Sequence, residues 1–203
     1  MPKIQSPQFK LICLTGGVVT GKSRIANWFK EQGWIVICTD EIVHSLYEPG
    51  QPLPHEIAHE FGKEILDSKG GVDRKELAKI VFRDPSALRR LNELVHPKVR
   101  LEWKRKVAEN QGKGKEILVV IPLAYETQVV SEFHEIWVAA CSESEQRHRL
   151  RDRGFDDFQI KDRLATQWPL QKKIDLANVV IWNNNSWSLT KEQLSLIKQI
   201  PLN

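Results

Sequence analysis

Residues 16–23 have the types and the spacing that hold phosphate groups. They read GGVVTGKS and fit the pattern G-x-x-x-x-G-K-[ST], between an apolar run and an amphipathic segment. Glycine lets the backbone turn tightly, so that consecutive N–H groups converge on phosphate oxygens at the positive end of a helix. The residues expected to contact the phosphates of ATP are Gly16, Gly17, Val18, Val19, Thr20, Gly21, Lys22 and Ser23.

Three side chains of this loop raise more specific expectations. Lys22 is expected to reach the β and γ phosphates, and the hydroxyl of Ser23 to bind Mg²⁺. Val19 stands where many such loops carry glycine. A β-branched residue is costly at positive φ, so we expect Val19 either to have negative φ or to be strained.

An acidic residue at the end of another apolar run narrows the class of protein. A GTPase needs N-K-x-D, which the chain lacks, and a motor ATPase ends a strand in aspartate, whereas the run ILVVI continues into Pro122. Asp40 does follow an apolar run, and parallel strands end at one edge of a sheet. Asp40 is therefore our candidate for activating an attacking hydroxyl and for binding Mg²⁺. An aspartate there would equally cap a helix that starts at residue 41.

The segments that must position these residues predict an α/β fold. Strands are expected at 10–15, 34–39, 117–121, 136–140 and 179–182, and most lack polar alternation, which is typical of strands covered on both faces. Helices are expected at 22–31, 40–47 and 189–198. The pattern predicts a three-layer α/β/α fold of the P-loop NTPase type with a five-stranded parallel sheet.

Two longer segments interrupt this core of residues 9–47, 115–142 and 174–203. Residues 48–114 contain no convincing strand and are expected to form a helical insertion, entered through a loop rich in proline (Pro49, Pro52 and Pro54). Residues 143–173 are dense in arginine and lysine. Arg149 and Arg153 are four apart, so on a helix they would share a face and clamp phosphates as part of a closing lid. A solvated basic helix would show the same pattern.

Composition limits the compartment and the partners. The 203 residues suffice for a single domain, and the net charge of +4 suits anionic small molecules better than nucleic acid. No apolar run approaches the roughly 20 residues of a membrane helix, and there is no signal-peptide region, so we expect a cytoplasmic monomer or weak homo-oligomer. The three cysteines (Cys13, Cys38 and Cys141) lie far apart and are expected to be reduced core thiols.

Over nearly its whole length the chain resembles the dephospho-coenzyme A kinase family. Asp40 stands where that family has its catalytic aspartate. The other matching residues are Leu14-Thr15-Gly16-Gly17, Glu48-Pro49-Gly50, Val72-Asp73-Arg74, Val81-Phe82, Leu91-Asn92, His96-Pro97, Pro122-Leu123 with Glu126, Gln146, Arg149, Arg153, Arg163, Gln167, Pro169, Lys173, Ala177, Val180, Ile181 and Asn183.

The resemblance implies transfer of the γ-phosphoryl group of ATP to the ribose 3′-hydroxyl of dephospho-coenzyme A, with Mg²⁺. It implies catalytic roles for Asp40, Lys22 and Arg149, and contacts with ATP for Arg153 and Asn183. The residues implied to bind the acceptor are Thr15, Asp40, Arg74, His96, Pro97 and Glu126. Taken alone, His96 is as typical of a buried core histidine, Asp73-Arg74 of a helix cap and a surface charge, and Glu126 of an exposed loop carboxylate.

The chain departs from the family pattern at a few positions and keeps Lys22, Ser23 and Asp40. The departures are Val19 for glycine, Cys38 for an acid, Ala124-Tyr125 for Leu-Phe and Asn178 for aspartate. Two other functions stay open on the residues alone. One is another small-molecule kinase with a phosphate loop, which would not need the Arg74 and His96 segment, and the other is a protein that binds ATP without catalysis.

Overall fold

The computed structural model describes residues 9–81 and 84–199, and the chain divides into two compact units. One unit is formed by Met1–Ile37 together with Asn110–Asn203, and the other by Cys38–Glu109. The first unit contains the strands and the second is helical. Phe82 of the Val81-Phe82 motif lies outside the described residues.

The sheet has five strands in the order β2-β3-β1-β4-β5. The pairings of β1 with β3, of β1 with β4 and of β4 with β5 are parallel. Every residue of β1 and β3 is buried, which explains why these runs are apolar without alternation. The predicted α/β fold with a five-stranded parallel sheet is confirmed, and the strands span Leu11–Gly16 (β1), Ile35–Cys38 (β2), Ile117–Val120 (β3), Glu135–Ala140 (β4) and Val179–Trp182 (β5).

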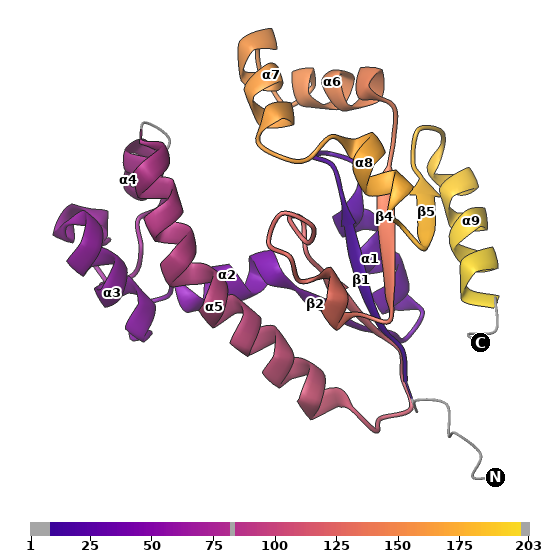
Figure 1. Cartoon of the computed structure of the whole chain (residues 1–203), viewed down its shortest axis with the longest axis horizontal. Helices are drawn as coiled ribbons and strands as arrows, with labels where there is room; N and C mark the ends of the chain where they lie inside the picture. The colour runs from indigo at the N-terminus through magenta and orange to yellow at the C-terminus, as the bar shows by residue number, and fades with distance from the viewer. Residues whose placement is uncertain (1–8, 82–83, 200–203) are drawn as a thin grey trace. The chain divides into compact units, whose positions relative to one another are not determined.

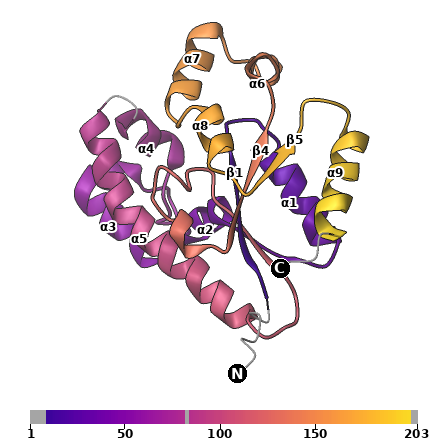
Figure 2. The same ribbon diagram turned by 45° about the vertical axis from the view of Figure 1, so that its right-hand side comes forward.

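Two helices lie side by side along the sheet, α1 (Lys22–Glu31) and α9 (Trp187–Gln199) (Figures 1 and 2). Near their N-terminal ends the guanidinium of Arg24 lies 4.2 Å from the centre of the Trp187 ring. Beneath α1, the ring of Phe29 packs 5.4 Å from that of Trp137 on β4, and both side chains are almost fully buried. This aromatic contact fixes α1, and with it the loop that precedes α1, against the sheet.

Three short helices follow β4 in the chain: α6 (Glu143–Arg151), α7 (Asp157–Ala165) and α8 (Leu170–Asp175). Of these, α6 and α7 lie beyond the ends of the strands (Figure 1). The hydroxyl of Ser142 accepts a hydrogen bond from the N–H of Glu145 and starts α6. Asp156 and Gln159 form a reciprocal capping box that starts α7. These caps hold the arginine-rich segment in defined helices.

The second unit contains α2 (Thr39–Leu46), α3 (Pro52–Phe61), α4 (Arg74–Val81) and most of α5 (Pro85–Asn110). The prediction that the proline-rich loop continues past Pro52 is wrong. Pro52 occupies the first turn of α3, where proline loses no helical hydrogen bond. The buried side chains that hold the helices together include Ile57, Ile65, Leu77, Leu91 and Val95. The predicted boundaries of the insertion, 48–114, stay a prediction.

None of the described helices has both the length and the apolar character needed to cross a membrane. Cys13 and Cys141 are buried and Cys38 is half-buried, and all three are free thiols. Burial raises the pKa of the Cys13 and Cys141 thiols, so both stay protonated and unreactive at neutral pH. The expectation of reduced core thiols is confirmed for these two cysteines.

Candidate nucleotide site

The predicted phosphate loop connects β1 to α1. The strand ends at Gly16 and the helix begins at Lys22, so the loop occupies the positive end of a ten-residue helix. The Lys22 ammonium hydrogen-bonds the carbonyls of Gly17 at 2.6 Å and Gly16 at 3.3 Å. It therefore lies against the backbone of the loop, close to where phosphate oxygens would bind.

Ser23 is the second residue of α1 and its side chain is exposed. Among the described residues no three His, Cys, Asp or Glu side chains gather as metal ligands. Mg²⁺ in phosphate sites is held mainly by phosphate oxygens, water and one or two protein oxygens. An accessible hydroxyl beside the loop fits this donor set, and Mg²⁺ at Ser23 stays a prediction.

Val19 has a φ of 53°, in the left-handed region that a β-branched residue avoids. Of the two alternatives that the sequence left open, the structure shows the strained one. The loop therefore contains a residue whose backbone conformation costs about 1 to 2 kcal/mol.

We expect Val19→Gly to keep full turnover or to increase it, because glycine adopts positive φ without that cost. The check is steady-state kinetics together with urea denaturation. Val18→Gly is the matched control, since Val18 is not among the described residues with positive φ and should only lose stability. A collapse of activity in Val19→Gly alone would show that the loop requires the valine side chain.

Asp40 lies two residues beyond β2, as the second residue of α2, and its side chain is exposed. The alternative interpretation as a helix cap is wrong, because α2 begins at Thr39 and its N-cap position is Cys38. The Asp40 carboxylate therefore does not cap α2. Its roles in catalysis and in Mg²⁺ binding stay predictions.

The two predicted lid arginines differ in position. Arg149 is on α6, and its guanidinium donates to the carbonyls of Val19 at 3.0 Å and Asn183 at 2.6 Å. Arg153 does not share a helix face with it, because α6 ends at Arg151 and Arg153 stands in the following turn, exposed. The sequence-based expectation of a paired clamp on one helix is therefore wrong, although contacts of each residue with ATP stay a prediction.

Asn183, implied only by the family resemblance, does lie at the phosphate loop. It directly follows β5 and is 6% exposed, and its side-chain amide donates to the Thr20 carbonyl at 2.9 Å. A second residue of α6, Gln146, donates to the Val18 carbonyl at 2.8 Å. Gln146 was among the residues that match the family, but nothing in the sequence assigned this contact.

A cavity of about 690 Å³ opens beside the phosphate loop. It is bounded by Gly17 and Val18 of the loop, by side chains of α6, α7 and α8, among them Arg147 and Lys161, and by Trp168 between α7 and α8. Two cations and an aromatic ring next to a phosphate-binding loop suit an anionic ligand with flat apolar parts. The predicted lid segment thus forms one wall of a space large enough for a substrate.

Glu126 lies after β3 in a buried ion pair that sequence spacing does not show. Its Oε1 is 2.8 Å from the ammonium of Lys173, which is fully buried, and accepts a hydrogen bond from the N–H of Trp168 at 2.8 Å. Lys173 also donates to the Pro122 carbonyl, which accepts a further bond from the Thr15 hydroxyl. The pair therefore ties the loop after β3 to α8, and contacts of Glu126 and Thr15 with the acceptor stay predictions.

We expect Lys173→Met to lower the free energy of unfolding by about 3 to 5 kcal/mol, because it leaves the Glu126 carboxylate buried without its cation. Urea denaturation measures this loss. Lys172→Met is the matched control and should cost at most about 1 kcal/mol, since Lys172 is exposed and its ammonium lies over the face of the Trp168 ring in a cation–π pair. The double variant Glu126→Gln/Lys173→Met should be more stable than Lys173→Met, and equal losses in Lys172→Met and Lys173→Met would contradict this account.

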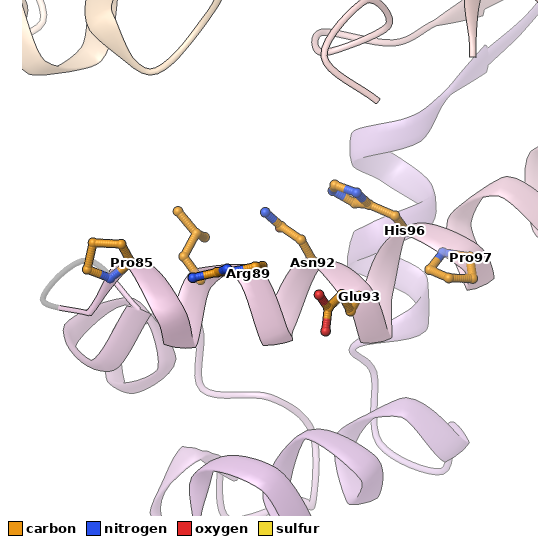
Figure 3. Close-up of a pocket in the computed structure, with 7 residues that line it drawn as sticks. Pro85, Arg89, Asn92, Glu93, His96 and Pro97 are labelled. Carbon is orange, nitrogen blue, oxygen red and sulfur yellow. The ribbon is translucent and has the colours of Figure 1, made fainter. Parts of the chain in front are cut away.

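In the helical unit, His96 and Pro97 border a groove of about 480 Å³ on α5 (Figure 3). Asn92 and His96 project from the same side of the helix, and Pro85 and Arg89 lie further along the groove. Burial lowers the pKa of His96, so the imidazole is neutral at physiological pH and can donate and accept one hydrogen bond each. Binding of the acceptor by His96 and Pro97 stays a prediction.

Arg74 begins α4, and its guanidinium lies 2.8 Å from Nε2 of His44. The neighbouring Asp73 accepts hydrogen bonds from the N–H groups of Lys75 and Glu76 at the start of the helix. Asp73 therefore acts as a helix cap, which was one of the readings left open. Arg74 is placed on the helical unit beside an imidazole, and its contact with the acceptor stays a prediction.

The parallel sheet, the phosphate loop and the cationic helices beside that loop define the class of phosphotransferases with a phosphate loop. A family profile described as dephospho-CoA kinase matches residues 10–188. The chain therefore belongs to the dephospho-CoA kinase family.

Individual relatives agree with this placement. The chain is 39% identical over 191 residues to a dephospho-CoA kinase of Carboxydothermus hydrogenoformans, covering 93% of each chain. It is 35% identical to a dephospho-CoA kinase of Shouchella clausii, covering 90% of this chain and 94% of the relative. A crystal structure of a Thermus thermophilus protein matches with a TM-score of 0.81 at 25% identity, covering 96% of this chain and 99% of that one.

Proposed function

We propose that this protein transfers the γ-phosphoryl group of ATP to the ribose 3′-hydroxyl of dephospho-CoA, giving coenzyme A and ADP. The observation that carries the proposal is the phosphate loop between β1 and α1 in a chain of the dephospho-CoA kinase family. The reaction breaks the bond between the γ phosphorus and the β,γ-bridging oxygen and forms a bond to the ribose oxygen. The hydroxyl proton must leave, and ADP carries away the bridging oxygen.

The residues of the loop bind and orient the donor in this proposal. The backbone N–H groups hold the phosphates, and Lys22 exchanges its present carbonyl partners for β and γ oxygens, where it offsets charge on the departing ADP. When bound, Mg²⁺ neutralises phosphate charge, and Ser23 with Asp40 would hold it. Charge stabilisation of this kind supplies most of the catalysis in phosphoryl transfer.

Asp40 and the cations of the lid segment have separate roles in the proposal. Asp40 orients the ribose hydroxyl and accepts its proton. Arg147 and Lys161, which line the cavity beside the loop, attract substrates that both carry several negative charges. In the helical unit, Arg74, His96 and Pro97 are proposed to bind dephospho-CoA.

The proposal is tested by incubating the purified protein with ATP, Mg²⁺ and dephospho-CoA and measuring the mass of the acceptor. We expect the acceptor to gain one phosphoryl group at the 3′-position, with one ADP formed for each product. Adenosine and pantetheine serve as controls because each represents only part of the acceptor, and both should react far more slowly. Faster reaction with adenosine would indicate another small-molecule kinase, and ATP binding without product would indicate a non-catalytic protein.

A further inference from the structure

Three consecutive carbonyls of the phosphate loop accept hydrogen bonds from side chains that lie outside the loop. The Val18 carbonyl accepts from Nε2 of Gln146 at 2.8 Å, and the Val19 carbonyl from Nη1 of Arg149 at 3.0 Å. The Thr20 carbonyl accepts from Nδ2 of Asn183 at 2.9 Å. We call Gln146, Arg149 and Asn183 the carbonyl clasp.

A fixed carbonyl also fixes an N–H group. In a planar trans peptide, the N–H of residue i+1 points opposite to the carbonyl of residue i. The clasp therefore turns the N–H groups of Val19, Thr20 and Gly21 away from its own side chains. These are the amides on which a phosphate loop depends, so the clasp sets their direction before any nucleotide arrives.

The donors of the clasp are themselves held in place. Gln146 is 4% exposed and Asn183 is 6% exposed, so neither side chain can easily turn toward water. The side-chain oxygen Oδ1 of Asn183 accepts a hydrogen bond from the fully buried hydroxyl of Thr190, which leaves the side-chain nitrogen Nδ2 facing Thr20. Arg149 is anchored by Glu145 at 2.8 Å. The clasp is therefore a built structure rather than a chance contact of mobile side chains.

The clasp approaches so closely that it restricts the residues of the loop. A β-carbon at Gly17 would lie 2.7 Å from Nε2 of Gln146, and one at Gly21 would lie 2.2 Å from Nδ2 of Asn183. Both distances are shorter than real contacts of a β-carbon. Gly17 and Gly21 therefore need to lack a β-carbon for two reasons: the clasp side chains lie too close, and phosphate must approach the loop backbone.

The carbonyl clasp also explains how Val19 is held in its strained backbone conformation. Both of its flanking peptide groups are fixed, one through the Val18 carbonyl and one through its own carbonyl. These two hydrogen bonds offset the cost of the left-handed conformation at a β-branched residue. Without the bond from Gln146, the peptide before Val19 is free to rotate and the conformation can relax.

We propose that Gln146 is a positioning residue for nucleotide binding, which holds the peptide between Val18 and Val19 so that its N–H faces the phosphates. The inference rests on the proposed function only in taking ATP as the ligand of the loop. Gln146 acts through the loop backbone, so its loss should weaken ATP binding and leave the KM for dephospho-CoA unchanged.

The direct test is Gln146→Leu, which keeps a side chain of similar size and removes the donor. We expect the Kd for ATP, measured by calorimetry without acceptor, to rise about tenfold, the effect of losing one hydrogen bond of about 1.4 kcal/mol. Gln32→Leu is the matched control, because Gln32 lies at the C-terminal end of α1, away from the phosphate loop, and accepts a hydrogen bond from Lys198. Equal ATP affinity in wild type and Gln146→Leu would overturn the inference.

A second variant separates positioning from loss of packing. Gln146→Glu has the shape of glutamine, and its carboxyl group can donate to the Val18 carbonyl only when protonated. As pH rises the group ionises and the donor is lost, so the ratio of its ATP Kd to the wild-type Kd should increase with pH. A ratio independent of pH would contradict the inference even if Gln146→Leu folds poorly.

A double-mutant comparison tests whether Gln146 holds Val19 in its strained conformation. If Gln146 holds Val19 at positive φ, its loss should matter less where glycine adopts that φ unaided. We expect Gln146→Leu to raise the ATP Kd less in a Val19→Gly background than in the wild type, and strictly additive effects would contradict this link. Failure of wild type to bind ATP would instead refute the proposed function, so the two failures are distinguishable.

Discussion

Lys22→Ala should lower kcat for phosphoryl transfer by about 10² to 10³-fold, the effect of removing one preorganised group that stabilises transition-state charge. The ammonium already lies against the Gly16 and Gly17 carbonyls of the loop. It therefore needs only a short movement to reach the β and γ phosphates. Alanine leaves no cation at that position, so negative charge on the departing ADP is no longer offset.

The measurement for Lys22 is ADP release at saturating ATP and acceptor. Lys30→Ala is the matched control, because Lys30 is exposed in the last turn of the same helix and should keep wild-type turnover. Lys22→Arg should also be impaired, since a planar guanidinium is larger than the compact ammonium that the loop surrounds. Turnover near that of wild type in Lys22→Ala would exclude the assigned role.

Asp40→Asn should lower kcat by about 10² to 10⁴-fold, the usual contribution of a general base, and should leave the Kd for ATP close to that of wild type. The substitution preserves the size of the side chain and removes its ability to accept a proton. Asp40 is exposed in the first turn of α2 and does not cap that helix, so the change should not prevent folding.

Glu41→Gln provides the comparison for Asp40. Glu41 is the neighbouring carboxylate in the same helical turn and is also exposed, so both variants lose a similar stabilising interaction with the helix dipole. Single-turnover kinetics with calorimetric ATP binding would separate chemistry from affinity. If Glu41→Gln and Asp40→Asn lost equal turnover, general-base catalysis by Asp40 would be contradicted.

The fold could be predicted from the sequence because its signals are local. The strands are continuous apolar runs, since parallel strands covered on both faces need no polar alternation. The start of α3 was missed because proline was interpreted as a sign of a loop, although it is also favourable in the first turn of a helix. The predicted pairing of Arg149 with Arg153 failed because α6 ends between them.

The candidate site could be predicted only in part, since many of its contacts join distant residues. The phosphate loop was evident from its own spacing, whereas Gln146 reaches a carbonyl 128 positions earlier in the chain. The pair of Lys173 with Glu126 likewise depends on how α8 packs near the loop after β3. Periodicity carries no information about such contacts. Of the distant residues that donate to the phosphate loop, Arg149 was anticipated as a lid residue and Asn183 through the family resemblance.

The most direct test of the central claim is a crystal structure of this protein with Mg²⁺ and an ATP analogue that cannot transfer its terminal phosphate. We predict a triphosphate surrounded by the N–H groups of residues 17–23, with the Lys22 ammonium moved from the Gly17 carbonyl onto phosphate oxygens. The clasp bonds to the Val18, Val19 and Thr20 carbonyls should be retained. A nucleotide bound elsewhere, with Lys22 still on its carbonyls and the loop closed by Val19, would contradict the account.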